Sequence, residues 1–207
     1  MTEIKAILVD YGGVLVENPS NTENIARIAE DIGIDPTRLK EGIYGKNREL
    51  WNRAKLGLIS ETDHWYEAEK NLQVSKSKLY WARHELFETA QVHDRFVDFL
   101  KSLHRSYSLG IVSNAIPAFT EAWRKLGFLD WFDVVINSSL VKLAKPDPEI
   151  YKLAYKRLNL PPEACILVDD QPKNLTTASQ MGFQVVHYVD ESQAIAAINK
   201  LLGTQNN

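Results

Sequence analysis

The stretch Ile4-Lys5-Ala6-Ile7-Leu8-Val9-Asp10-Tyr11-Gly12-Gly13 places four consecutive apolar residues before an acid and two glycines. A short apolar run that stops at turn residues is typical of a strand buried on both faces. Glycine permits positive φ angles and a close approach of the backbone to neighbouring groups. The stretch therefore predicts a buried strand that ends at Asp10 and enters a tight loop.

Strand and helix patterns alternate again from about residue 92 onward. Helices are predicted over 94–103, 118–126, 148–158, 173–181 and 192–201, and strands over 107–112, 134–136, 165–168 and 185–188. Such alternation implies βαβ units with right-handed crossovers. The predicted fold class is α/β, with a Rossmann-like doubly wound parallel sheet covered on both faces. The tail 203–207 is expected to be frayed.

The segment between these two regions, residues 18–91, has helical periodicity instead. Asp35-Pro36 is typical of a helix start, and Ser60-Glu61-Thr62-Asp63 resembles a capping box. Strand signals are few. We therefore predict an all-helical insert of about four helices.

The composition excludes several classes of protein. With 207 residues, 44% apolar and 25% charged, the chain is ordinary for a globular protein. The 24 basic and 27 acidic residues form no basic stripe of the kind that binds nucleic acid. No apolar run approaches the roughly 18–20 residues of a membrane span, and no signal-peptide pattern is visible. The single cysteine, Cys165, lies in an apolar run and is expected to be buried, which suits the cytoplasm.

Polar residues follow three of the predicted strands. They are Asp10, the pair Ser113-Asn114 and the pair Asp169-Asp170. Ligands of open α/β sheets bind beyond the carboxyl ends of the strands, so these groups should converge. Lys145 lies in the loop after another strand and is expected to reach the same place. Three carboxylates, a hydroxyl, an amide and a lysine indicate a site for Mg²⁺ and a phosphate group.

Four motifs in this order resemble the haloacid dehalogenase-like hydrolases over nearly the whole chain. The motifs are Asp10-Tyr11-Gly12-Gly13-Val14-Leu15, Ile111-Val112-Ser113-Asn114, Lys145-Pro146-Asp147-Pro148-Glu149-Ile150-Tyr151 and Leu167-Val168-Asp169-Asp170-Gln171-Pro172-Lys173-Asn174. The first motif looks like the branch similar to bacterial α-glucose-1-phosphate phosphatases. The resemblance implies a core domain formed by residues 1–17 and 92–207, with residues 18–91 as a helical cap.

The resemblance also implies a role for each residue of the site. Asp10 would be the nucleophile and form an aspartyl-phosphate. Mg²⁺ would be held by Asp10, the Gly12 carbonyl and Asp170, with Asp169 as a ligand or behind the ligands. The phosphoryl group would be bound by Ser113, the Asn114 backbone and Lys145, and Asn174 would orient Asp170 or Lys145.

One departure from the family pattern concerns the proton donor. The family's second aspartate, the general acid, is Gly12 here, and general acid–base help contributes roughly 10²- to 10⁴-fold in rate. Glu17 is our first choice for a substitute acid, although an ordinary loop glutamate is the favoured reading. His64 is expected to be a surface residue or to pack within the cap rather than to replace the acid. Two further sets of candidates lie in the cap. The tryptophans are expected in its core rather than at the substrate, and they are Trp51, Trp65 and Trp81. One helix face is expected either to be solvated or to look down on the site and set specificity, and it carries Tyr44, Arg48 and Asn52.

The preferred function is a Mg²⁺-dependent phosphatase acting on a small phosphorylated metabolite, with a sugar phosphate as the expected class. A haloacid dehalogenase is the alternative that shares the nucleophile. A non-catalytic binding domain is the third reading, and the glycine at position 12 is its only support. No nucleic-acid or membrane partner is expected, and the chain should be a monomer or a weak homodimer.

Overall fold

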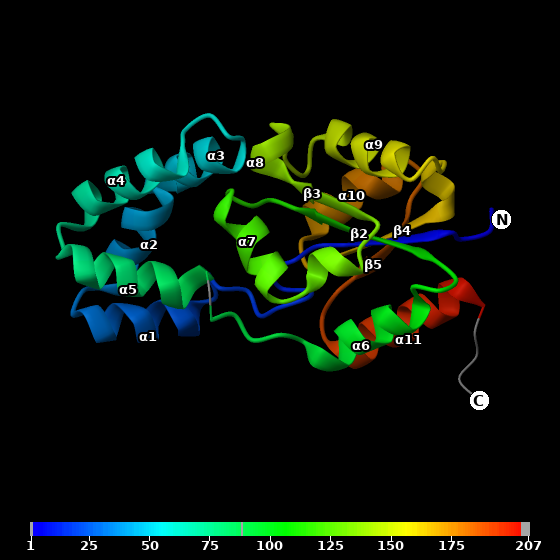
Figure 1. Cartoon of the computed structure of the whole chain (residues 1–207), viewed down its shortest axis with the longest axis horizontal. Coiled ribbons are helices and arrows are strands. Elements are labelled where there is room, and N and C mark those ends of the chain that lie inside the picture. Colours follow the sequence, from blue (N-terminus) through cyan, green and yellow to red (C-terminus); the bar gives the residue numbers. More distant parts are fainter. Residues whose placement is uncertain (1, 88, 204–207) are drawn as a thin grey trace.

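A five-stranded parallel sheet forms the centre of the computed structural model, which describes residues 2–87 and 89–203 (Figure 1). The strand order is β3-β2-β1-β4-β5. The strands are β1 (Ala6–Val9), β2 (Ser108–Ser113), β3 (Val134–Asn137), β4 (Cys165–Asp169) and β5 (Gln184–His187). The predicted doubly wound α/β class is confirmed, with the first strand at its centre.

Helices cover both faces of the sheet, which explains the unbroken apolar run of β1. Ile7 and Val9 belong to the apolar cluster on the α6 and α11 side, whereas Ala6 and Leu8 belong to the cluster beneath α9 and α10 (Figure 1). Cys165 is buried as predicted, and burial raises the pKa of its thiol to about 12. The helices outside the insert are α6 (Asp94–Leu103), α7 (Ala118–Lys125), α8 (Ser138–Val141), α9 (Pro148–Arg157), α10 (Pro172–Gln180) and α11 (Glu191–Leu202).

Residues Thr22–Phe87 form the helical insert, which lies beside the sheet at the left of Figure 1. Its helices are α1 (Thr22–Ile32), α2 (Pro36–Tyr44), α3 (Glu49–Lys55), α4 (Glu61–Leu72) and α5 (Lys76–Phe87), joined between α2 and α3 by the 3₁₀ turn Lys46–Arg48. The described insert thus has five α-helices, one more than predicted. The extra break comes at Gly45, whose φ of 77° and ψ of 157° favour glycine, and Arg48 follows at a φ of 63°.

The segments that enter and leave the insert lie side by side. Val16 and Val92 form an antiparallel bridge, and the Glu17 amide donates to the Gln91 carbonyl at 2.8 Å. No helix in the described ranges is long and apolar enough to cross a bilayer. The predicted fraying of the tail lies outside the described residues beyond Gly203, which caps α11.

Candidate functional site

The carboxyl ends of three adjacent strands bring the predicted site residues together. β1 pairs with β2 on one side and with β4 on the other. Asp10 directly follows β1, and Ser113 and Asp169 are the last residues of its two neighbours. After β1 the chain first builds β2 and β3 and then crosses to build β4 and β5 on the other side. The site therefore lies at the point where the direction of winding reverses, as expected for this fold class.

Three carboxylates converge at this point. Asp10, Asp169 and Asp170 each offer an oxygen, and these oxygens lie within 4.8 Å of one another. Gly13 makes room for the third acid: its φ is 84°, and a Cβ there would lie 2.8 Å from Asp170 Oδ2. Closely spaced carboxylate oxygens are a donor set that suits a hard divalent cation.

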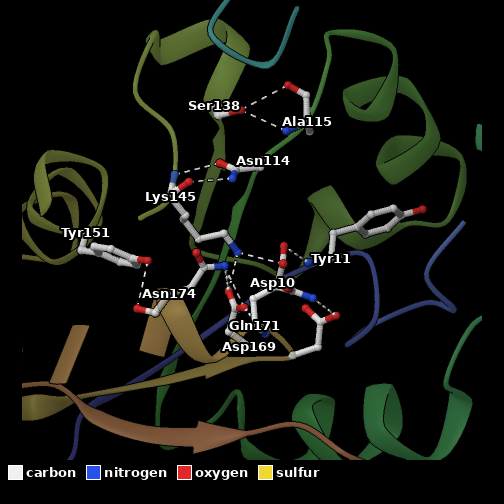
Figure 2. Close-up of polar contacts among 11 residues, drawn as sticks. Asp10, Tyr11, Asn114, Ala115, Ser138, Lys145, Tyr151, Asp169, Gln171 and Asn174 are labelled. Carbon is white, nitrogen blue, oxygen red and sulfur yellow. Dashed lines mark hydrogen bonds and ion pairs between the residues drawn. The ribbon is translucent and has the colours of Figure 1, made fainter. Parts of the chain in front are cut away.

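Lys145 supplies the positive charge that separates two of these acids. Its Nζ lies 2.9 Å from Asp10 Oδ2 and 2.6 Å from Asp169 Oδ2 (Figure 2). Asn114 fixes the lysine backbone, because its Oδ1 accepts from the Lys145 amide at 2.8 Å and its Nδ2 donates to the Lys145 carbonyl at 2.9 Å. Burial opposes the charge, but the two carboxylates outweigh it and raise the pKa of Lys145. The lysine is therefore held as an ammonium.

Asp10 is buried and points toward Lys145. Burial raises the pKa of its carboxyl to about 6, although Lys145 acts in the opposite direction. The Tyr11 amide donates to Asp10 Oδ1 at 2.7 Å, so both carboxylate oxygens have a donor. At neutral pH the group is mainly an ionised carboxylate, the form that a nucleophile requires.

Asp169 is surrounded by donors. Asn174 Nδ2 lies 2.9 Å from Oδ1 and 3.1 Å from Oδ2, and the Gln171 amide donates to Oδ1 at 2.8 Å (Figure 2). The prediction that Asn174 orients Asp170 or Lys145 is therefore wrong, because its side chain contacts the Asp169 carboxylate. The reason is local: α10 begins at Pro172, and its first turn folds back over the end of β4.

A cavity of about 370 Å³ lies between this cluster and the helical insert. The sheet side contributes Asp10, Gly12, Ser113, Asn114, Lys145, Asp170 and Lys173, and the insert contributes Tyr44, Arg48, Trp51, Asn52 and Lys55. Tyr44, Arg48 and Asn52 do not share one helix, because the break at Gly45 separates them, yet all three line the cavity. Trp51 also lines it, so this residue is not confined to the core of the insert.

Several predicted candidates lie away from the cavity. Glu17 is exposed and outside the cavity lining, which removes the main support for it as a substitute acid. His64 is buried within the insert, where its Nε2 lies 2.8 Å from the Ile43 carbonyl, so its packing role is confirmed. Trp65 and Trp81 pack within the apolar cluster.

Two lysines that line the cavity were missed by the sequence reasoning. Lys173 lies within the fourth motif, three residues after Asp170, and Lys55 follows Asn52 by three residues on α3. In the sequence, Arg48, Asn52 and Lys55 are spaced as residues on one helix face, so this spacing could have identified Lys55 as a further candidate. The sequence reasoning used only the first two of these residues.

Comparisons with known proteins place this geometry in context. A family model described as haloacid dehalogenase-like hydrolase matches residues 4–182. A phosphorylated carbohydrates phosphatase from Thermotoga maritima is 27% identical over 93% of this chain and 90% of its own length. Acyl-CoA dehydrogenase family member 10 from Mus musculus is also 27% identical, over 96% of this chain, but the match spans only 19% of that longer protein.

Two solved structures share the fold. A HAD-like family hydrolase from Porphyromonas gingivalis aligns with a TM-score of 0.77 at 24% identity, covering 99% of this chain and 100% of that one. A HAD family enzyme from Bacteroides thetaiotaomicron, in complex with magnesium and inorganic phosphate, aligns with a TM-score of 0.74 at 22% identity, covering 89% and 93%. At these identities the likeness concerns the fold.

Proposed function

The chain belongs to the haloacid dehalogenase-like hydrolases, and we propose that it is a Mg²⁺-dependent phosphatase that acts on a small phosphorylated metabolite. The observation that carries the proposal is the buried pair of ion bridges from Lys145 to Asp10 and Asp169 at the end of the cavity. This arrangement holds one ionised carboxylate and one ammonium against a space large enough for a small ligand.

The acidic cluster fits a magnesium ion. We assign Asp10, the Gly12 carbonyl and Asp170 as its ligands. Asp170 lines the cavity, whereas the Asp169 carboxylate is occupied by Lys145, Asn174 and the Gln171 amide. Asp169 is therefore not assigned as a direct metal ligand, and we propose that it positions Lys145. When bound, Mg²⁺ supplies positive charge that stabilises the oxygens of a transferring phosphoryl group.

In the proposed reaction, an Asp10 carboxylate oxygen attacks phosphorus. The new P–O bond forms an aspartyl-phosphate while the ester P–O bond breaks, and the leaving oxygen takes a proton from water in the cavity. A water molecule then attacks the phosphorus and regenerates the carboxylate, with inorganic phosphate as product. The Ser113 hydroxyl, the Asn114 backbone amide and the Lys145 ammonium are proposed to bind the phosphoryl oxygens, where they stabilise the transition state.

The helical insert is proposed to act as a cap over this centre, with residues 18–91 as one domain and residues 1–17 and 92–207 as the other. It contributes Tyr44, Arg48, Trp51, Asn52 and Lys55 to the cavity. A sugar phosphate is the proposed substrate class, and the T. maritima relative, named for phosphorylated carbohydrates, supports it. We further propose a cytoplasmic monomer or weak homodimer.

The two alternative functions each lack support from the site. A dehalogenase without a metal would leave the three converging carboxylates of Asp10, Asp169 and Asp170 with Lys145 as their one ion-pair partner among the described residues, so the acidic cluster would lack the charge that a divalent cation supplies. A non-catalytic domain would not require a buried carboxylate that an ion pair with Lys145 keeps ionised, as it does at Asp10. Gly12 removes one proton donor but leaves the nucleophile and its surroundings in place.

The test is release of inorganic phosphate from a panel of phosphate monoesters, with Mg²⁺ and with EDTA, beside chloride release from chloropropionate. Phosphate release that requires Mg²⁺ is the expected result. Asp10→Asn should abolish turnover while the far-UV circular dichroism spectrum stays unchanged, because the amide is nearly isosteric but a poor nucleophile. Chloride release without metal, or residual phosphatase activity above a few per cent in Asp10→Asn, would contradict the proposal.

A further inference from the structure

Three cationic side chains line the cavity in addition to Lys145. Arg48 and Lys55 come from the helical insert, and Lys173 comes from the first turn of α10. Among the described residues, none of the three forms an ion pair with a carboxylate. Cations that line a ligand-sized cavity and lack an acidic partner are available to an anion that enters it.

The segment that carries the two insert-side cations is anchored through its backbone and through Tyr44. The Lys55 carbonyl accepts a hydrogen bond from Ser138 Oγ at 2.6 Å, and the same hydroxyl accepts from the Ala115 amide at 3.0 Å. Arg48 lies over the Tyr44 ring, 4.9 Å from its centroid. These contacts anchor the backbone of α3 near the loop that follows β2, so the end of the helix that carries Lys55 has a defined position beside the cavity.

The three cations also repel one another when no anion is present. Burial lowers the pKa of Lys55, and the positive charges of Lys173 and then Arg48 lower it further. Like charges gathered around one cavity oppose the folded state unless a ligand of opposite charge relieves the repulsion. This arrangement is typical of a binding surface rather than of a surface that serves stability alone.

The balance of charge indicates how much negative charge the cavity accepts. The three acids of the cluster are neutralised by Lys145 together with one divalent cation. With the cluster neutral, Arg48, Lys55 and Lys173 give the cavity a net charge of +3, and a phosphate monoester dianion bound at the cluster would lower it to +1. One positive charge remains for another part of the same ligand.

We propose that Arg48, Lys55 and Lys173 form a second anion subsite, which binds a carboxylate or a second phosphate on the leaving-group side of the substrate. The inference rests on the proposed phosphatase function and narrows it to phosphate esters that carry a further negative charge. The cavity of about 370 Å³ suits such a small metabolite. The three residues are specificity determinants in this assignment and take no part in the chemical step.

The test compares kcat/KM within two matched pairs of substrates. One pair is 2-phosphoglycolate and ethyl phosphate, which differ by a carboxylate, and the other is fructose 1,6-bisphosphate and fructose 6-phosphate, which differ by a phosphate. We expect the ester with the additional anion to be preferred at least about tenfold in one pair or both, equivalent to about 1.4 kcal/mol. The pair that shows the preference identifies the second group.

Charge-removing variants locate the subsite. Lys55→Met and Lys173→Met should each lower the preference at least about fivefold, and the preference of the wild type should fall as salt rises. Lys46→Met is the matched control, because Lys46 is exposed on the same segment of the insert but lies outside the cavity lining. Its preference ratio should equal that of the wild type.

The outcomes separate this inference from the proposed function. Turnover with equal kcat/KM within both pairs overturns the subsite and leaves the phosphatase in place. A preference that Lys46→Met lowers as much as Lys55→Met also overturns it, because the effect would then come from net charge. No phosphate release from any of the four esters or from p-nitrophenyl phosphate overturns the proposed function and the subsite with it.

Discussion

The two walls of the cavity are built in different ways. On the sheet side, Asp10, Lys145 and Asp169 are buried, and each charge has at least one charged partner at 2.6–2.9 Å. On the insert side, Arg48 is exposed and Lys55 is half-buried, and neither has an acidic partner in the described part of the chain. The buried cluster of Asp10, Lys145 and Asp169 pairs its own charges, whereas the insert side leaves its cations available to a ligand.

In the proposed phosphatase, this difference assigns the chemical step to the buried cluster and the selection of substrate to the insert side. Ionised groups in a buried network keep a fixed position, which a reacting nucleophile requires. Cations on an exposed helix end tolerate substitution, because surface charges contribute little to stability. The four predictions below test this division, beginning with the change that should have the largest effect.

Lys145→Met should remove the two buried ion pairs on the sheet side of the cavity. It leaves two buried carboxylates without their cation, so we expect a loss of about 3–5 kcal/mol in the free energy of unfolding as well as loss of activity. Urea denaturation measures the first effect. Lys152→Met, which removes an exposed lysine paired with Glu149, is the control and should cost less than about 1 kcal/mol.

A second substitution separates charge from packing at this position. Asp169→Asn removes one of the unpaired acids, so the double variant with Lys145→Met should be more stable than Lys145→Met alone. Equal stability of the two proteins would show that the lysine acts through packing of its side chain.

Asp170→Ala should remove metal binding while leaving the ion bridges of Lys145 intact. Mg²⁺ at 100 times its dissociation constant stabilises a folded protein by about 2.7 kcal/mol through mass action. Differential scanning fluorimetry should therefore show a rise in Tm with Mg²⁺ in the wild type and little rise in the variant. Glu17→Ala, an exposed acid outside the cavity lining, is the matched control. An equal Mg²⁺ response in both variants would reject Asp170 as a ligand.

Gly12→Asp should restore a proton donor between the two walls. Gly12 has no positive φ, and a Cβ there would meet only Pro19 Cδ, at an ordinary 3.6 Å, so the loop should accept the side chain. We expect kcat/KM for alkyl phosphates to rise by about 10²-fold, the lower end of general acid catalysis, with less change for p-nitrophenyl phosphate.

The control for this prediction is Gly12→Asn, which matches aspartate in size but has no titratable proton. The measurement is the dependence of kcat/KM on the pKa of the leaving group, which should be steep in the wild type and flatter in Gly12→Asp. Equal slopes for the Asp and Asn variants would show that another group already supplies the proton.

His64→Gln should change the stability of the insert with pH, the smallest of the four effects. Burial lowers the pKa of His64 below its ordinary value of 6.5, so the unfolded chain binds a proton that the folded chain resists. The wild type should therefore lose stability as pH falls below about 6.5, by at most about 1.4 kcal/mol per pH unit from this group. Tm profiles between pH 5 and 8 should show a shallower loss in the variant. Superimposable profiles would contradict a neutral buried imidazole.

The sequence predicted the sheet side of the site more fully than the insert side. Asp10, Ser113 and Asp169 end parallel strands, and the alternation of strand and helix is sufficient to bring them to one edge. Asn174 was expected to orient a different partner, because the direction of a side chain in the first turn of a helix depends on how that turn packs. The break at Gly45 was missed because a single glycine does not distinguish a helix end from a tolerated interruption.

What the sequence by itself determined was the family, the fold class and the chemical character of the site, because these depend on residue type, order and periodicity. Local patterns carry that information without a structure. Only the tertiary structure decided that Glu17 lies away from the cavity, and that Lys55 and Lys173 line the same cavity although 118 positions separate them. The physical reason is that the insert packs against the sheet domain through contacts between residues far apart in the sequence, such as Ser138 and Lys55. Local sequence patterns do not indicate which distant residues make such contacts.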